Sequence, residues 1–323
     1  MSSRVVKVFK LTKYGGNPIL RPDPSRRFME FAAFNPTALA LGGKVYILFR
    51  AQSYELESTI GLAVSPDGFT LEYVSENPVY VPREFFEKRV VYGVGPVGCE
   101  DPRATLVDGT VYVLYTAVSD AYDYVRVALT SISVSDFVEG RWDRWSKPIL
   151  VSPPGVWDKN AALLPRRVRG KYVIFHRFFP NIWVDFLDDL GFRGYWLRGF
   201  EFFRVRPGMW DSDKVGIAGV PIEVSEGWVM IYHARSAYDG AYRLGAALLD
   251  REDPTTVISR LEHPILEPTE WYETEGVNVV FSCGHVVLDN KLVVYYGASD
   301  KYLAVAYGDL DELVGELLKQ QGA

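Results

Sequence analysis

The sequence has few of the residues and runs that mark several large classes of protein. Only two of its 323 residues are cysteines, and the positions of Cys99 and Cys283 match neither a disulfide framework nor a metal site. No stretch reaches the roughly 18 consecutive apolar residues of a membrane-spanning helix, and the N-terminal residues lack the apolar core of a secretion signal. We therefore expect a cytoplasmic protein that does not enter a membrane.

Basic residues are too few for a nucleic-acid partner. The formal net charge is -6 at pH 7 and the pI is about 5.4, so no basic stripe is available to follow a phosphate backbone. Gln52, Gln320 and Gln321 are the only glutamines, a scarcity typical of heat-adapted proteins. We expect small-molecule partners and no nucleic acid, and the composition leaves a homo-oligomer open.

Motifs that bind common cofactors are also missing. The sequence contains no glycine-rich phosphate loop after a strand and no G-x-S-x-G nucleophile motif. Its histidines, His176, His233, His263 and His285, are isolated, which argues against a metal site. We predict a protein without a metal or an organic cofactor.

What the sequence does contain is a repeat. Short runs rich in Val, Ile, Tyr and Phe alternate with turn residues, as in strands joined by tight turns. Five such runs resemble one another and start 56 to 66 residues apart: KVYILFR from Lys44, TVYVLYT from Thr110, KYVIFHR from Lys171, GWVMIYH from Gly227 and KLVVYYG from Lys291. This period fits one four-stranded blade of a β-propeller.

Each run is the second half of a predicted β-hairpin. Asn35 to Arg50 aligns without a gap on Asp101 to Thr116, the same 16-residue frame fits 218–233 and 282–297, and 160–177 needs two extra residues. We predict an all-β fold, a single five-bladed β-propeller catalytic domain over residues 1–323. A double β-sandwich is the alternative, but it gives no reason for a fivefold repeat. An amphipathic pattern over 309–321, after an Asp309 N-cap, predicts one C-terminal helix on the outside of the propeller.

The two ends of the frame should gather at one mouth of the central channel. Basic residues recur there, and one more lies four residues ahead of the fourth frame: Lys159, Arg177, His233 and Lys214. Cations gathered in this way repel one another unless an anion joins them, and phosphate suits such a cluster. The alternative for Lys214 is a loop lysine paired with Asp211 or Asp213.

Two acids, Glu100 and Asp101, begin the second frame. Because side chains alternate across a strand, only one of them should face the channel squarely, and the register with Asn35 favours Asp101. One acid within a ring of polar and cationic groups is a candidate general acid. We expect Glu100 to support the site by holding Arg103 or by capping backbone amides of the turn.

The motifs together resemble glycoside hydrolase family 130, the β-mannoside phosphorylases and related mannosidases. They are, in order, GCEDPRATLVDGTVYVLYT, WDKNAALLP, KYVIFHR, WDSDKVG, GWVMIYH, YRLGAALLDREDP, NVVFSCG and YYGASDKYLAVA. The resemblance implies that Asp101 is the general acid, and it also implies two sets of binding residues. Asn35, Arg50 and Asp300 would bind the mannosyl unit, and Lys159, Arg177, Lys214 and His233 would bind phosphate, with Tyr242 close by.

The family reaction implied is an inverting phosphorolysis of β-1,4- or β-1,2-linked manno-oligosaccharides. Inorganic phosphate is the co-substrate, the product is α-mannose 1-phosphate, and the acid protonates the glycosidic oxygen through the 3-hydroxyl of the sugar. The sequence departs from the family at GIAGVP after Lys214, where relatives have a Gly-Pro-rich stretch, and at Lys159, where many have arginine.

Three alternatives remain open at this stage. An inverting mannosidase would need a second carboxylate, for which Glu273 and Glu275 are candidates; the alternative for both is a place in a solvated loop. Hydrolases of the arabinanase and fructosidase type rest on three carboxylates, and a cation-rich mouth argues against them. A non-catalytic sugar-binding propeller would keep the aromatic residues and lose the acid. Linkage, acceptor sugar and oligomeric state are not predicted.

Overall fold

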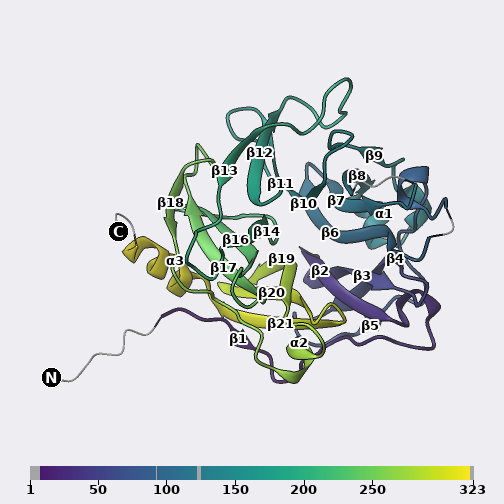
Figure 1. The fold of residues 1–323 in the computed structure, drawn as a ribbon, viewed down its shortest axis with the longest axis horizontal. Coiled ribbons are helices and arrows are strands. Elements are labelled where there is room, and N and C mark those ends of the chain that lie inside the picture. Colours follow the sequence, from purple (N-terminus) through teal and green to yellow (C-terminus); the bar gives the residue numbers. More distant parts are fainter. Residues whose placement is uncertain (1–7, 92, 122–124, 321–323) are drawn as a thin grey trace.

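Five antiparallel blades surround a central axis (Figure 1), and a parallel pairing of strands joins the first two blades into one eight-stranded sheet. The computed structural model describes residues 8–91, 93–121 and 125–320. The innermost strands are β2 (Ala32–Leu41), β6 (Val97–Val107), β10 (Asp158–Leu163), β14 (Lys214–Ile217) and β19 (Val280–Leu288). This arrangement confirms the predicted all-β five-bladed propeller.

The five predicted runs are the second strands of the blades, β3 (Lys44–Gln52), β7 (Thr110–Val118), β11 (Tyr172–Phe178), β16 (Gly227–Arg235) and β20 (Lys291–Ala298). The third strands are β4 (Glu57–Ser65), β8 (Arg126–Ser133), β12 (Asn181–Leu187), β17 (Tyr242–Leu249) and β21 (Tyr302–Asp309). Short outer strands complete the blades: β5 (Tyr73–Val74), β9 (Ile149–Leu150), β13 (Phe200–Phe203), β18 (Val257–Arg260) and β1 (Thr12–Lys13). The first strand of blade 4 is interrupted and resumes as β15 (Ile222–Val224).

The recurring NPIL, NPVY, KPIL and HPIL segments form an outer pairing in four blades. Leu20 pairs with Leu303, Tyr80 with Ile60 and Leu266 with Leu244, while KPIL supplies β9. These segments therefore belong to the repeat.

The ring is closed by strands from opposite ends of the chain. β1 pairs antiparallel with β21, through Thr12 with Tyr307 and Lys13 with Ala306. Between blades 1 and 2, β4 runs parallel to β6, and Gly98 lies there with φ 111°. A Cβ at Gly98 would come within 2.1 Å of the Ser58 carbonyl oxygen, so only glycine permits this close approach.

Buried acids hold the strand ends of blades 2 and 5. Glu87, in the short helix η2 (Phe85–Glu87), accepts a hydrogen bond from the Tyr115 hydroxyl and caps the backbone N–H of Glu84. Glu273, in α2 (Trp271–Thr274), accepts one from the Tyr296 hydroxyl at 2.8 Å. Both acids are fully buried.

Blades 3 and 4 contain the same device with other residues. The Tyr232 hydroxyl donates to Asp211 at 3.0 Å, and the His176 ring nitrogens lie 3.0 Å from Asp158 and 2.9 Å from Asp185. Although burial opposes a charge, Asp158 and Asp185 raise the pKa of His176 to about 9. In all four blades the held aromatic ring comes directly before the last residue of the frame.

The remaining helices are short and peripheral: η1 (Arg27–Met29), α1 (Val134–Val138), η3 (Trp142–Arg144) and α3 (Leu310–Lys319). The predicted C-terminal helix is confirmed as α3, with the Asp309 side chain accepting from the N–H of Glu312. Leu313 and Leu317 are fully buried against the outside of blades 4 and 5. Residue 321 of the predicted range lies outside the described residues. None of the described helices has the length and apolar character needed to cross a membrane.

Candidate active site

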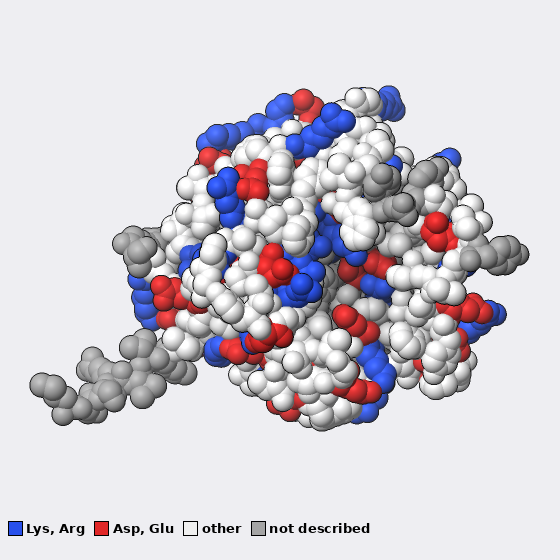
Figure 2. All heavy atoms as spheres, viewed as in Figure 1, with Lys and Arg blue, Asp and Glu red and all other residues white. Residues whose placement is uncertain are grey.

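A cavity of about 650 Å³ opens at one mouth of the channel. Figure 2 shows basic and acidic side chains meeting around the hollow at the centre of this face. All but two of the proposed site residues line it: Asn35, Arg50, Asp101, Lys159, Arg177, Lys214, Tyr242 and Asp300. The exceptions are Glu100 and His233.

The inward-facing residues of three blades lie on β-bulges. The pairing register shifts between Phe34 and Thr37, between Glu100 and Arg103, and between Lys159 and Ala162. Inside these shifts Asn35, Asp101 and Asn160 have φ values of 47°, 52° and 54°. Asn and Asp tolerate this left-handed region better than other residues with side chains. The sequence signal for the bulges is therefore the Asn or Asp that recurs at the frame start.

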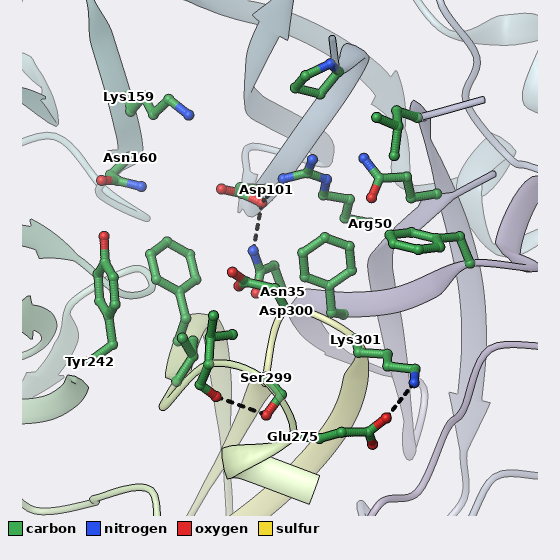
Figure 3. Close-up of a pocket in the computed structure, with 18 of the residues that line it drawn as sticks. Asn35, Arg50, Asp101, Lys159, Asn160, Tyr242, Glu275, Ser299, Asp300 and Lys301 are labelled. Atoms are coloured by element: carbon green, nitrogen blue, oxygen red, sulfur yellow. Dashed lines mark hydrogen bonds and ion pairs between the residues drawn. The ribbon is translucent and has the colours of Figure 1, made fainter. Parts of the chain in front are cut away.

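Asp101 is buried and held by two neighbours. Its Oδ1 accepts a hydrogen bond from Asn35 Nδ2 at 2.8 Å and lies 3.3 Å from Arg50 Nη1 (Figure 3). Burial alone would raise the pKa of Asp101, but the positive charges of Arg50 and Lys159 outweigh burial and hold this pKa below its ordinary value. In the free protein, Asp101 is therefore a carboxylate of fixed orientation.

Glu100 supports the site through other partners than those predicted. Its Oε1 accepts from Arg50 Nη2 at 2.8 Å and its Oε2 lies 3.5 Å from Lys159 Nζ. Both acids reach Arg50 because the bulge breaks the alternation that the prediction assumed. The predicted contact with Arg103 is wrong, since Arg103 donates instead to the carbonyl oxygens of Ile217 at 3.0 Å and Ala218 at 2.9 Å. Its guanidinium thus crosses the channel between blades 2 and 4.

Asp300 projects into the cavity beside Asp101 and Arg50 (Figure 3). Removal from bulk water raises the pKa of its carboxyl group, the nearby carboxylates of Asp101 and Glu100 add to this, and Arg50 opposes it. The carboxyl oxygens of Asp300 can accept hydrogen bonds from sugar hydroxyls.

The opposite wall carries cations without acid partners. Arg177 and Lys214 make no ion pair or hydrogen bond with an acid among the described residues, and Lys214 Nζ lies 5.2 Å from the centre of the Tyr242 ring. Burial, together with Arg177 and Arg235, lowers the pKa of Lys214 to about 8. The alternative pairing of Lys214 with Asp211 or Asp213 is wrong. Those acids bind other partners, Arg206 and Arg260 for Asp211 and Arg235 for Asp213.

His233 does not reach the cavity. It is 1% exposed, and its Nε2 lies 3.3 Å from Oδ1 of Asn160, which does line the cavity. Burial and the charges of Arg103 and Arg177 hold the pKa of His233 well below its ordinary range. The imidazole is therefore neutral, and the structure places it behind Asn160 rather than among the cations as expected from the sequence.

The two candidate second carboxylates differ in position. Glu273 is fully buried in its capping role, away from the cavity, so neither the predicted base role nor a solvated loop applies to it. Glu275 lines the cavity rim and binds Lys301 Nζ at 2.7 Å. Among the described residues no group of His, Cys, Asp or Glu side chains is arranged to hold a metal ion.

Fold and site define a five-bladed propeller whose mouth sets a buried carboxylate opposite unpaired cations. The family model described as β-1,4-mannooligosaccharide phosphorylase matches residues 8–319. The chain therefore belongs to glycoside hydrolase family 130, as the sequence motifs predicted.

Individual relatives cover nearly the whole chain. A 1,2-β-oligomannan phosphorylase of Thermoanaerobacter is 36% identical over 317 residues, 95% of this chain and 99% of the relative. A β-1,2-mannobiose phosphorylase from the same organism is also 36% identical, over 93% of this chain and 97% of the relative. The solved structure of the β-1,2-mannobiose phosphorylase of Listeria innocua, in complex with β-1,2-mannobiose, superposes with a TM-score of 0.79 at 26% identity, covering 96% and 99% of the two chains.

Proposed function

We propose that this protein catalyses the inverting phosphorolysis of β-1,2-linked mannosides, releasing α-mannose 1-phosphate. The observation that carries the proposal is the pair of unpaired cations, Arg177 and Lys214, facing the same cavity as the buried Asp101. Half-buried cations without acid partners favour an anionic ligand, and inorganic phosphate is an anion that also serves as a nucleophile. The β-1,2 linkage is proposed because the two relatives that are 36% identical to this chain are named for it.

In the proposed reaction, a phosphate oxygen forms a bond to C1 of the mannosyl unit while the bond from C1 to the leaving sugar breaks. Phosphate rests on Lys159, Arg177 and Lys214, with the Tyr242 hydroxyl as a further donor. Asn35, Arg50 and Asp300 hold the mannosyl unit. The leaving oxygen receives a proton that originates on Asp101 and passes through the 3-hydroxyl of the sugar.

Phosphate also explains how Asp101 comes to carry a proton. In the free protein, the charges of Arg50 and Lys159 favour the ionised carboxylate. A phosphate dianion bound to Lys159 and its neighbours cancels part of this positive field, so the proton affinity of Asp101 rises when the nucleophile binds. Asp101 is then protonated in the complex that reacts.

Hydrolysis is the competing function, and Glu275 is the carboxylate it would use. That side chain is engaged by Lys301, and a hydrolase gives no role to Arg177 and Lys214. The unpaired cations are therefore stronger support for a phosphorylase than Glu275 is for a mannosidase.

The deciding experiment incubates the protein with β-1,2-mannobiose and with β-1,4-mannobiose, each with and without inorganic phosphate. We expect mannose 1-phosphate from the β-1,2 isomer only when phosphate is present. Equal cleavage with and without phosphate, giving free mannose alone, would identify a mannosidase. Faster phosphorolysis of the β-1,4 isomer would overturn the linkage while leaving the reaction class in place.

A further inference from the structure

The cavity has a third wall that the proposed reaction leaves unused. Phe31, Leu56 and Val277 line it together with the ion pair of Lys301 and Glu275. The N–H of Ala33 donates to the carbonyl oxygen of Lys301 at 3.0 Å, so the segments that carry Phe31 and Lys301 lie side by side. The residues of this wall come from blades 1 and 5.

Its position follows from the geometry of an inverting displacement. Phosphate and the leaving group must lie on opposite faces of C1. In Figure 3, Lys159, Asn160 and Tyr242 lie on one side of Asp101 and Asp300, and Lys301 and Glu275 lie on the other. If phosphate occupies the cationic side, the leaving sugar is directed toward the third wall.

The chemistry of the wall fits a pyranose ring. The Phe31 ring is 41% exposed, offering an apolar face to the C–H face of a sugar. The Lys301–Glu275 pair beside it presents charged donors and acceptors, which suit neighbouring hydroxyls. An apolar face next to a donor–acceptor pair is also what a neutral polyol requires, since a second phosphate would be repelled by Glu275.

A second aromatic ring extends the wall outward. Tyr54 is 66% exposed, and its ring centre lies 5.8 Å from that of Phe31 in an edge-to-face arrangement. Tyr54 itself lies outside the cavity lining. If a leaving-group sugar packs on Phe31, a longer sugar chain would be needed to reach Tyr54.

We propose that Phe31 with the Lys301–Glu275 pair forms the subsite for the leaving-group sugar, and that Tyr54 binds the next sugar along the chain. The inference rests on the proposed phosphorolysis and deepens it. It assigns recognition of the acceptor to blades 1 and 5 and recognition of chain length to one exposed tyrosine.

The test uses the synthetic direction, with mannose 1-phosphate as donor and either mannose or β-1,2-mannobiose as acceptor. Phe31→Ala should raise the KM for both acceptors about 2- to 10-fold, the range expected for loss of one ring contact. The KM for mannose 1-phosphate should stay within about twofold of wild type. Tyr54→Ala should raise the KM for mannobiose alone.

Controls separate a lost subsite from general damage. Phe31→Tyr keeps a ring and should leave both acceptor KM values near wild type. Tyr73→Ala removes a tyrosine that is 50% exposed and does not line the cavity, so it should change nothing. An unchanged acceptor KM in Phe31→Ala, or an equal rise in the KM for mannose 1-phosphate, overturns the subsite in an active enzyme. Absence of any product with wild-type protein overturns the proposed function itself.

Discussion

The two walls of the cavity that meet at C1 of the proposed substrate differ in how their charges are satisfied. On the acid side, Asp101 and Glu100 share Arg50, and Asn35 donates to Asp101. On the cationic side, Arg177 and Lys214 have no acid partner among the described residues. The first wall is organised before any ligand arrives, whereas the second is completed only by an anion. A phosphorylase requires both an acid held in a fixed orientation and unpaired cations that can bind the phosphate nucleophile.

The largest expected effect comes from removing the proton on the acid side. Asp101→Asn keeps the shape and the Asn35 contact but has no acidic proton, so we expect kcat for phosphorolysis to fall by about 10²- to 10⁴-fold. Mannose should still raise the melting temperature. Steady-state rates and thermal shifts measure the two properties, with the exposed Asp188→Asn as control. Retention of more than a tenth of the wild-type rate would remove Asp101 from the acid role.

A smaller loss of kcat should follow from displacing the hydrogen-bond donor of Asp101 while keeping Asp101 itself. A Cβ at Gly297 would lie 2.0 Å from Oδ1 of Asn35, so Gly297→Ala should displace the amide that donates to Asp101. That hydrogen bond lowers the pKa of Asp101. Its loss raises the pKa, and the basic limb of the kcat profile, where the acid loses its proton, should move to higher pH.

Gly61→Ala is the matched control for this variant. Its Cβ would meet the buried Phe49 ring at 2.4 Å, a comparable steric clash away from Asn35. Both variants should lower the melting temperature, but only Gly297→Ala should shift the pH profile. A shift of the same size in both would show that the effect is a general loss of stability.

On the cationic side, Arg177→Gln should raise the KM for phosphate. Loss of one hydrogen bond to a charged group corresponds to about 10- to 100-fold weaker binding. The KM for mannobiose should change little, since the sugar is held by the other wall. Lys171→Met, which removes an exposed lysine paired with Asp188, serves as control. A rise confined to the KM for mannobiose would contradict the assignment of the two walls.

The smallest effect is expected from pH alone. Because the pKa of Lys214 is lowered to about 8, its ammonium is present below this pH and is lost as the pH rises through it. The KM for phosphate should therefore increase a few-fold between about pH 7 and 9. Lys214→Arg remains charged over this range and should flatten the increase. An equally steep increase in that variant would assign the titration to another group.

The sequence was sufficient for the fold and for the ring of candidate residues, because both follow from a repeat in register. The fivefold frame brings Asn35, Asp101 and Arg177 to one mouth whatever the loops do. It was not sufficient for the partners of Glu100 or the placement of His233. Those depend on the bulges, which rotate successive side chains away from strict alternation, and on the interruption of the first strand of blade 4.

The burial of Glu273 also could not be predicted from the sequence. From the sequence, a solvated loop was the alternative for Glu273, because polar residues surround it. Its burial comes from Lys13 and Tyr296, which lie more than two hundred and more than twenty residues away along the chain. Tertiary contacts of this separation leave no local pattern.

The closure of the ring by β1 and β21 has a consequence for how activity arises in the cell. The seam between blades 5 and 1 is also a wall of the cavity, where Asn35 packs on Gly297 and Ala33 on Lys301. A chain in which β20 and β21 have not yet formed therefore lacks this wall of the cavity. A circularly permuted gene that opens the ring between two other blades would therefore move the last seam to form away from the cavity wall of blades 5 and 1.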